Sequence, residues 1–284
     1  MKAMVCAQFA PIDALSYGDF AAPEAGPGEV VIDVAAAGVN YPDVLIVQGK
    51  YQTKPSVPFV PGSEASGRIA AVGEGVEGFA PGDRVIAFTG SGSFAQQVRV
   101  PATQVWPVPD GVDLDIAAGI AITYGTSYHA LKDRAGLKPG ETLLVLGAGG
   151  GVGLTAVELG KRMGARVIAA ASSAEKLALA QVQGADELID YAQEDLRERT
   201  KELTCSKGVD VVYDPVGGAM NLTAVKSLAW GGRLLIVGFA GGEIPSIPAN
   251  LLLLKSASAL GVLWGNSVRA DPALQGANMR QLLA

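Results

Sequence analysis

The chain has 284 residues, of which 49% are hydrophobic and 18% charged, so it can bury the core of one large domain or, more naturally, of two. Its formal net charge is -6 and no basic cluster stands out, which disfavours a nucleic-acid partner. No apolar run is long enough to span a bilayer, and the first residues read as a strand rather than as a secretory signal. We therefore expect a cytoplasmic protein with no membrane segment.

Residues 1 to about 120 are rich in Gly, Pro and Val and predict a β-rich domain. Turn sequences separate short alternating segments, a pattern typical of a barrel-like or sandwich-like fold. The predicted strands are 29–37, 65–72, 84–88 and 95–100. Helical patterns follow at 113–121 and 124–132.

From about residue 122 the pattern changes to alternating strands and helices. Near-continuous apolar strands between helices indicate a parallel sheet covered on both faces. The predicted strands are 142–146, 166–171, 187–191, 209–213, 233–237 and one near 259–263, and the helices are 152–163, 174–183, 193–203 and 219–229. The fold class is therefore α/β, with a doubly wound dinucleotide-binding domain after a β-rich one.

A glycine-rich turn follows the first of these strands. The strict Gly-x-Gly-x-x-Gly spacing fails, and Ala148-x-Gly150-x-x-Gly153 fits instead. Backbone without side chains can approach phosphates closely, and the N-terminus of the next helix offers unpaired N–H groups. We predict that a pyrophosphate binds here, contacted by Ala148, Gly150, Gly151, Val152 and Gly153. A flexible glycine-rich loop is the alternative, which the alternating strands and helices disfavour.

The end of the second parallel strand favours NADPH over NADH. An acidic residue there would bind the ribose hydroxyls and repel a 2′-phosphate, but the strand ends in alanines and serines. Ser172, Lys176 and the phenol of Tyr191 suit a phosphate. Alternatively, Lys176 is an exposed helix lysine and Tyr191 a packing residue.

Motifs along the whole chain resemble one family. They are Gly38-Val-Asn-Tyr-Pro-Asp43, Gln48-Gly-Lys-Tyr51, Pro61-Gly-Ser-Glu64, Gly73–Gly75, Gly82-Asp-Arg-Val85, Ala148–Gly153 and Asp214-Pro-Val-Gly-Gly218. This set is similar to the zinc-independent quinone oxidoreductase branch of the medium-chain dehydrogenase/reductase superfamily.

The resemblance implies how the chain is organised. It implies a GroES-like catalytic domain over 1–121, a Rossmann NADPH-binding domain over 122–264 and a segment returning to the first domain over 265–284, usually in a homodimer. Family members usually continue beyond this point. The resemblance therefore implies a chain that is truncated at its C-terminus, with exposed apolar surface on the first domain.

The resemblance also implies roles for individual residues. Asn40 and Asp43 would line the nicotinamide end of the cofactor site, and Thr126 would lie near the nicotinamide ribose. Ser172, Lys176 and Tyr191 match 2′-phosphate contacts. The loop beside the nicotinamide ring would be Val237, Gly238, Phe239 and Ala240. Tyr51 matches the tyrosine that related enoyl-thioester reductases use as a proton donor, although packing is an equal alternative.

No metal site is expected. Cys6, Cys205 and His129 are the only soft ligands and are scattered along the chain. Where zinc-dependent relatives carry a cysteine and a histidine, this chain has Asn40 and Ser63. The lone histidine is predicted to be structural.

Three functions follow in order of preference. The first is hydride transfer from NADPH to a quinone or an α,β-unsaturated carbonyl without a metal. The second is reduction of an enoyl thioester such as an acyl-CoA, for which a positioned acid matters more. The third is a non-catalytic NADPH-binding protein.

Overall fold

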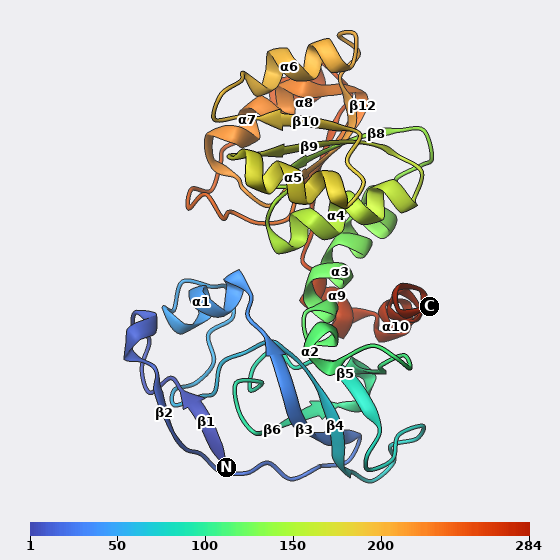
Figure 1. Cartoon of the computed structure of the whole chain (residues 1–284). Helices are drawn as coiled ribbons and strands as arrows, with labels where there is room; N and C mark the ends of the chain where they lie inside the picture. The colour runs from blue at the N-terminus through green and yellow to red at the C-terminus, as the bar shows by residue number, and fades with distance from the viewer. The chain divides into compact units, whose positions relative to one another are not determined.

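The computed structural model describes residues 1–284 and divides the chain into two compact units. The first unit comprises Met1–Gly125 and Gly265–Ala284, and the second Thr126–Trp264 (Figure 1). Helix α3 (Ile120–Tyr128) contains the boundary between them. No helix of either unit combines the length and apolar character needed to cross a membrane.

The first unit is built on a five-stranded antiparallel sheet of order β6-β3-β4-β5-β7. Alternating apolar residues of the long strand β3, such as Val30 and Ile32, are buried in its core beside Ile69 and Val85. The strands are β3 (Glu29–Gly38), β4 (Glu64–Val72), β5 (Arg84–Phe88), β6 (Gln97–Pro101) and β7 (Val105–Pro107), with a separate hairpin of β1 (Lys2–Val5) and β2 (Ser16–Asp19).

Helices of the first unit are short except for the last one. Helix α1 directly follows β3, so the end of that strand positions the start of the helix. The helices are α1 (Tyr41–Val47), α2 (Leu114–Ala117), α9 (Trp264–Ala270) and α10 (Pro272–Leu283), with 3-10 turns at Ile12–Ala14 and Ala102–Gln104.

The second unit is a six-stranded parallel sheet of order β10-β9-β8-β11-β12-β13. The strands are β8 (Thr142–Leu146), β9 (Arg166–Ala171), β10 (Glu187–Asp190), β11 (Val209–Asp214), β12 (Leu228–Ile236) and β13 (Ser258–Gly261). The helices are α4 (Gly151–Arg162), α5 (Ala174–Val182), α6 (Leu196–Leu203), α7 (Gly218–Ser227) and α8 (Ala249–Leu253). This arrangement confirms the predicted fold class.

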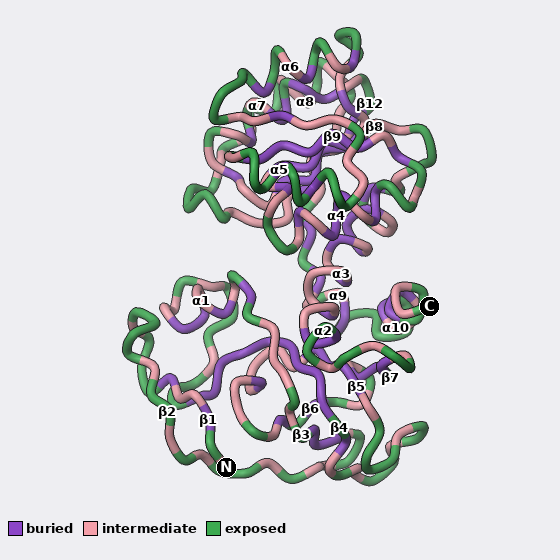
Figure 2. Tube along the Cα trace, viewed as in Figure 1, coloured by how far each residue is buried: buried purple, intermediate pink, exposed green.

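The strand order reverses between β8 and β11, and the glycine turn leaves the sheet at this point. Leu143 to Leu146 are fully buried, as are the apolar residues of β9, and Figure 2 shows both strands in the buried interior. A rigid apolar strand therefore holds the turn at the position where open α/β sheets bind ligands.

Several predicted boundaries were wrong. The helix predicted over 219–229 ends at Ser227, because Leu228 is fully buried and pairs with Val209 as the first residue of β12. Strand β10 ends at Asp190, so Tyr191 follows the strand instead of ending it. The predicted helix 113–121 is two helices, α2 and the start of α3.

The helix predicted over 124–132 also differs. It begins earlier, as α3, and from His129 to Arg134 it widens into a π-helix. Strand β1 agrees with the strand expected at the first residues. Strands β2 and β7 and helices α1, α8, α9 and α10 were not predicted.

Candidate active site

The turn between β8 and α4 presents backbone N–H groups at a helix N-terminus. Gly147 has a positive φ of 58°, and the Gly150 N–H closes the turn onto the Gly147 carbonyl at 2.9 Å. Gly150 precedes α4 and provides no side-chain cap. The Leu154 N–H donates to the Gly150 carbonyl at 2.8 Å, which is the first hydrogen bond of the helix. N–H groups in the first turn of such a helix can bind an anion.

Glycine is required at two positions of this turn for different reasons. A Cβ at Gly153 would collide with the carbonyl oxygen of Gly147 and lie 2.9 Å from the Cα of Ala148. The helix therefore packs directly against the turn. At Gly149 a Cβ would collide with the side chain of Lys176, which brings α5 to the same turn.

A buried cluster of three hydroxyl groups contacts the start of α4, next to the turn. Ser127 Oγ donates to the carbonyl of Val152 at 2.9 Å and lies 2.8 Å from Thr155 Oγ1 and 2.9 Å from the Tyr213 hydroxyl. Burial raises the pKa of Tyr213, so this phenol stays protonated and serves as a donor. The cluster joins α3, α4 and β11, and its members come from three separate segments with no motif that could have revealed them.

Two of the three residues predicted to contact the 2′-phosphate, Ser172 and Lys176, are hydrogen-bonded to each other. Lys176 Nζ donates to Ser172 Oγ at 3.1 Å, and both side chains are exposed. Tyr191 is half-buried, packs against the apolar core and donates its N–H to the Ala171 carbonyl at 3.1 Å. The ammonium therefore stands at the end of β9, beside the glycine turn.

Backbone hydrogen bonds join the loops that follow β11 and β12. Buried Asp214 accepts from the N–H groups of Val216 and Gly217 at 2.8 and 2.9 Å and from the Asn221 amide at 2.8 Å. In the segment 237–240, Val237 donates its N–H to the Asp214 carbonyl at 2.9 Å and Ala240 to the Pro215 carbonyl at 3.0 Å. Asp214 thus fixes the loop predicted to lie beside the nicotinamide.

In the first unit, Asn40 and Asp43 meet at the start of α1. Asp43 Oδ2 accepts from the Asn40 N–H at 2.8 Å, which caps the helix, and Asp43 Oδ1 accepts from Ser63 Oγ at 2.5 Å. Burial raises the pKa of Asp43, although both of these hydrogen bonds lower it.

Glu64 lies beside this cap and was not predicted as a site residue. It is 1% exposed and accepts from the Asn40 amide Nδ2 through Oε1 and from the Ile122 N–H through Oε2, each at 2.8 Å. Burial, opposed by these bonds, raises its pKa to about 7. The Pro61-Gly-Ser-Glu64 motif contained this residue, but only the fold shows that it reaches Asn40.

Tyr51 is half-buried and packs against the apolar cluster of Cys6, Ile46, Val47 and Phe59. Burial and the negative charge of Asp43 both raise the pKa of its phenol, so Tyr51 carries its proton at neutral pH. A protonated phenol near a carboxylate is compatible with either a donor or a packing role.

Thr126 and His129 lie on the helix that opens the second unit. Thr126 is half-buried in α3. His129 Nδ1 is 2.8 Å from the Asp133 carboxylate one turn on, which ties the π-helix to itself. No group of three or more His, Cys, Asp or Glu side chains is arranged to hold a metal ion.

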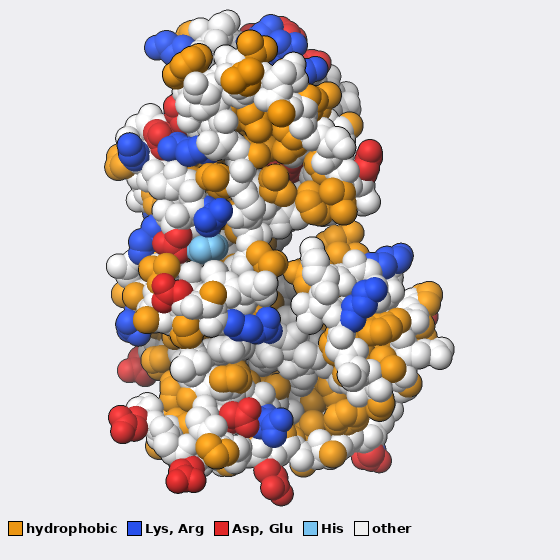
Figure 3. Space-filling view, turned by 180° about the vertical axis from the view of Figure 1, so that it is seen from behind, with side chains coloured by type: hydrophobic (Ala, Val, Ile, Leu, Met, Phe, Trp, Pro, Cys, Tyr) orange, Lys and Arg blue, Asp and Glu red, His pale blue; other side chains and the backbone are white.

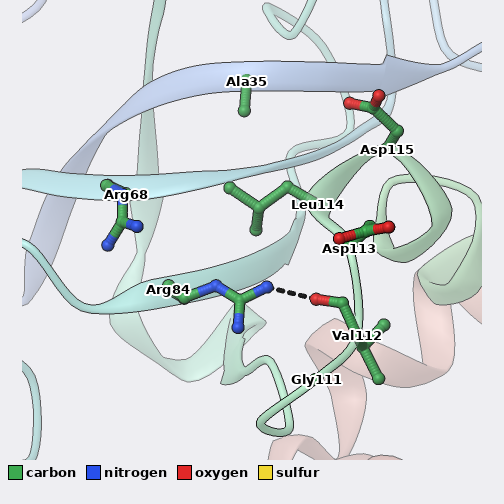
Figure 4. Close-up of a pocket in the computed structure, with 8 residues that line it drawn as sticks. All are labelled: Ala35, Arg68, Arg84, Gly111, Val112, Asp113, Leu114 and Asp115. Atoms are coloured by element: carbon green, nitrogen blue, oxygen red, sulfur yellow. Dashed lines mark hydrogen bonds between the residues drawn. The ribbon is translucent and has the colours of Figure 1, made fainter.

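One hollow of the first unit is lined by none of the predicted site residues. This hollow of about 580 Å³ lies between Arg68 and Arg84 on one side and Asp113 and Asp115 on another (Figure 4). Figure 3 shows acidic and basic side chains interspersed over the face it presents, without a patch of one sign.

Two families match the two parts of the chain. The alcohol dehydrogenase GroES-like domain matches residues 26–110, and the zinc-binding dehydrogenase family matches residues 151–278. Quinone oxidoreductase-like protein 2 of Rattus norvegicus is 41% identical over 283 residues, covering 99% of this chain and 80% of that protein.

The chain belongs to the quinone oxidoreductase branch of the medium-chain dehydrogenase/reductase superfamily. Among solved structures of this branch, the quinone oxidoreductase of Escherichia coli, complexed with NADPH, superimposes with a TM-score of 0.92 at 27% identity. The match covers 100% of this chain and 87% of that one. The quinone oxidoreductase of Thermus thermophilus, also described with its NADPH complex, gives a TM-score of 0.84 at 35% identity, covering 100% of this chain and 86% of that one.

Proposed function

We propose that this protein is an NADPH-dependent oxidoreductase that reduces conjugated carbonyl compounds, quinones or α,β-unsaturated ketones, without a metal. The observation that carries the proposal is the glycine turn at the switch point of the parallel sheet, with Lys176 beside it. The NADPH complexes of two relatives support the same cofactor.

The residues of the second unit fit a dinucleotide phosphate. The N–H groups of 151–153 suit the pyrophosphate, and Ser172, Lys176 and Tyr191 suit the 2′-phosphate. When bound, NADPH supplies a hydride from its nicotinamide C4 to the acceptor. We propose that the segment 237–240 and Thr126 lie along the nicotinamide riboside.

The residues of the first unit would orient the acceptor and manage the proton. Two-electron reduction of a quinone needs one hydride and one proton, and the hydroquinone anion is delocalised, so solvent can supply that proton. We propose that Asn40 and Asp43 face the reacting end of the site and that two hydrogen bonds to Asp43, from the Asn40 N–H and the Ser63 hydroxyl, keep them rigid. No acid of unusual strength is then needed.

A screen of NADPH oxidation tests the proposal. The 284-residue protein is assayed with a panel of quinones, enones and enoyl-CoA esters, each with and without enzyme. We expect turnover with quinones or enones and slower turnover with NADH. NADPH binding without oxidation by the whole panel would instead identify a non-catalytic NADPH-binding protein.

The second candidate is an enoyl-thioester reductase, for which Tyr51, a half-buried phenol that keeps its proton at neutral pH, is the candidate acid. Protonating the carbon of an enolate requires a positioned acid. Tyr51→Phe then abolishes reduction of enones and thioesters but leaves quinone reduction intact. Tyr17→Phe, on the exposed hairpin, is the matched control. Equal loss of all activities in Tyr51→Phe would instead point to packing.

Further aspects of the assignment stay predictions. These are independence from zinc, a homodimer, a cytoplasmic location and the domain limits 1–121, 122–264 and 265–284. The substitution of Asn40 and Ser63 for metal ligands supports the first. Metal analysis of the purified protein and its mass in solution test two of them directly.

A further inference from the structure

Two N–H groups donate to the buried Glu64 carboxylate. Asn40 Nδ2 lies 2.8 Å from Oε1 and the Ile122 N–H lies 2.8 Å from Oε2. Gly38, which pairs with Glu64 across β3 and β4, leaves the space that the carboxylate occupies, because a Cβ there would lie 2.8 Å from Glu64 Cδ. The structure at this point is therefore built around the acid.

An ionised carboxylate has acceptors only, whereas an asparagine amide has a donor end and an acceptor end. Glu64 can therefore be met only by the NH₂ of Asn40, and the Oδ1 of Asn40 must point the other way. Asn40 is 9% exposed and its backbone N–H donates to Asp43, so the side-chain amide has little freedom apart from a flip.

We propose that Glu64 is a positioning residue that determines which end of the Asn40 amide faces the ligand, so that an acceptor oxygen is presented when Glu64 is ionised and a donor NH₂ when it is neutral. The inference rests on the proposed function for one point, the location of Asn40 at the reacting end of the site. The orientation itself rests on the hydrogen bonds alone.

The neutral form follows from the same contacts. The Ile122 N–H requires an acceptor, so a proton on Glu64 is carried by Oε1 and is donated to Asn40, whose amide then turns its oxygen toward Glu64. The pKa of Glu64 is raised to about 7. Asp43 on α1 is the ionisable group that faces Glu64, and its negative charge raises this pKa, while the backbone N–H groups at the start of α3 lower it.

The direct test is the NMR signal of the Asn40 side-chain NH₂ in protein labelled with ¹⁵N-asparagine. The signal is assigned by its absence in Asn40→Ser. We expect it to titrate with a midpoint near 7 in the wild type and to be independent of pH in Glu64→Gln, which mimics the neutral form. A signal that does not titrate, or that titrates equally in Glu64→Gln, overturns the proposal.

Kinetics supply the second readout. In Glu64→Gln the Asn40 amide is inverted at every pH. We therefore expect kcat/KM at high pH to fall about tenfold, which corresponds to the loss of one hydrogen bond to the ligand. The dependence of kcat/KM on pH near 7 should also disappear. Ser66→Ala, on the same face of β4, removes a different buried hydrogen bond, to the Leu114 carbonyl at 2.6 Å, and keeps the wild-type pH profile.

A merely structural Glu64 would lower the melting temperature and leave the pH profile unchanged, which would contradict the proposal. If the NMR signal titrates but Glu64→Gln leaves kcat/KM unchanged, the orientation of the amide is supported. The placement of Asn40 at the reacting end of the site is then wrong.

Discussion

The substitution Gly153→Ala tests how the turn between β8 and α4 is built. The added methyl would overlap the carbonyl oxygen of Gly147 and lie 2.9 Å from both the Gly147 carbonyl carbon and the Ala148 Cα. These are backbone atoms, so no side-chain rotation relieves the contact, and α4 must move away from the turn. Gly150→Ala is the matched control, because its methyl meets only the Gly147 oxygen, at 3.4 Å, and φ at Gly150 is an ordinary -88°.

The two variants separate packing from ligand approach. Carbon atoms in ordinary contact are about 3.5 Å apart or more, so Gly153→Ala requires a shift of several tenths of an ångström. Overpacking of this kind costs about 1–3 kcal/mol of unfolding free energy. Gly150→Ala should change that free energy by no more than about 0.5 kcal/mol. Both should weaken NADPH binding about tenfold or more, Gly153→Ala by misaligning the N–H groups and Gly150→Ala by obstructing the phosphates.

Urea unfolding measures the first effect and titration of NADPH fluorescence the second. The reasoning is refuted if Gly153→Ala is as stable as the wild type, or if Gly150→Ala binds NADPH with wild-type affinity.

Three further predictions concern the groups around the two candidate sites. Tyr213→Phe removes the buried donor to Ser127 and should cost about 1–2 kcal/mol in urea unfolding, with a smaller loss of NADPH affinity; unchanged stability would show that the hydroxyl cluster does not support the turn. Lys176→Ala should weaken NADPH binding about tenfold and leave NADH binding unchanged, as measured by titration with both cofactors; equal losses would exclude a 2′-phosphate contact. Because folding raises the pKa of Glu64 from 4.5 to about 7, its contribution to stability is complete below 4.5 and is lost as the pH rises through 7. The free energy of unfolding, measured with urea at a series of pH values, should therefore decline less in Glu64→Gln than in the wild type over this range. An identical decline in both proteins would contradict the raised pKa.

Much of the second unit could be predicted because local and tertiary signals agree there. Strands β8 and β9 have the predicted limits, because a continuous apolar run between two helical patterns is typical of a strand that is buried on both faces of a sheet. The end of α7 could not be predicted, because the sequence around Leu228 suits a helix and only the burial of that residue against β11 makes it a strand. Helix propensity is a weak preference that tertiary packing overrides.

The candidate sites were predicted in part. The glycine turn and Lys176 could be proposed from the local sequence together with the alternating strands and helices around them. Glu64 and the cluster of Ser127, Thr155 and Tyr213 could not be found in this way. Their partners lie 24 to 86 residues away in sequence, so their roles depend on strand register and helix placement.

Transfer of deuterium from NADPH tests the central claim most directly. The protein is incubated with NADPH carrying deuterium at C4 of the nicotinamide, on each face in turn, and with an α,β-unsaturated ketone. The account predicts oxidation of the cofactor with deuterium from one face appearing on the β-carbon of the product, in protein that contains no stoichiometric metal. Tight binding of NADPH with no transfer to the enone, and no oxidation by any quinone, would contradict it.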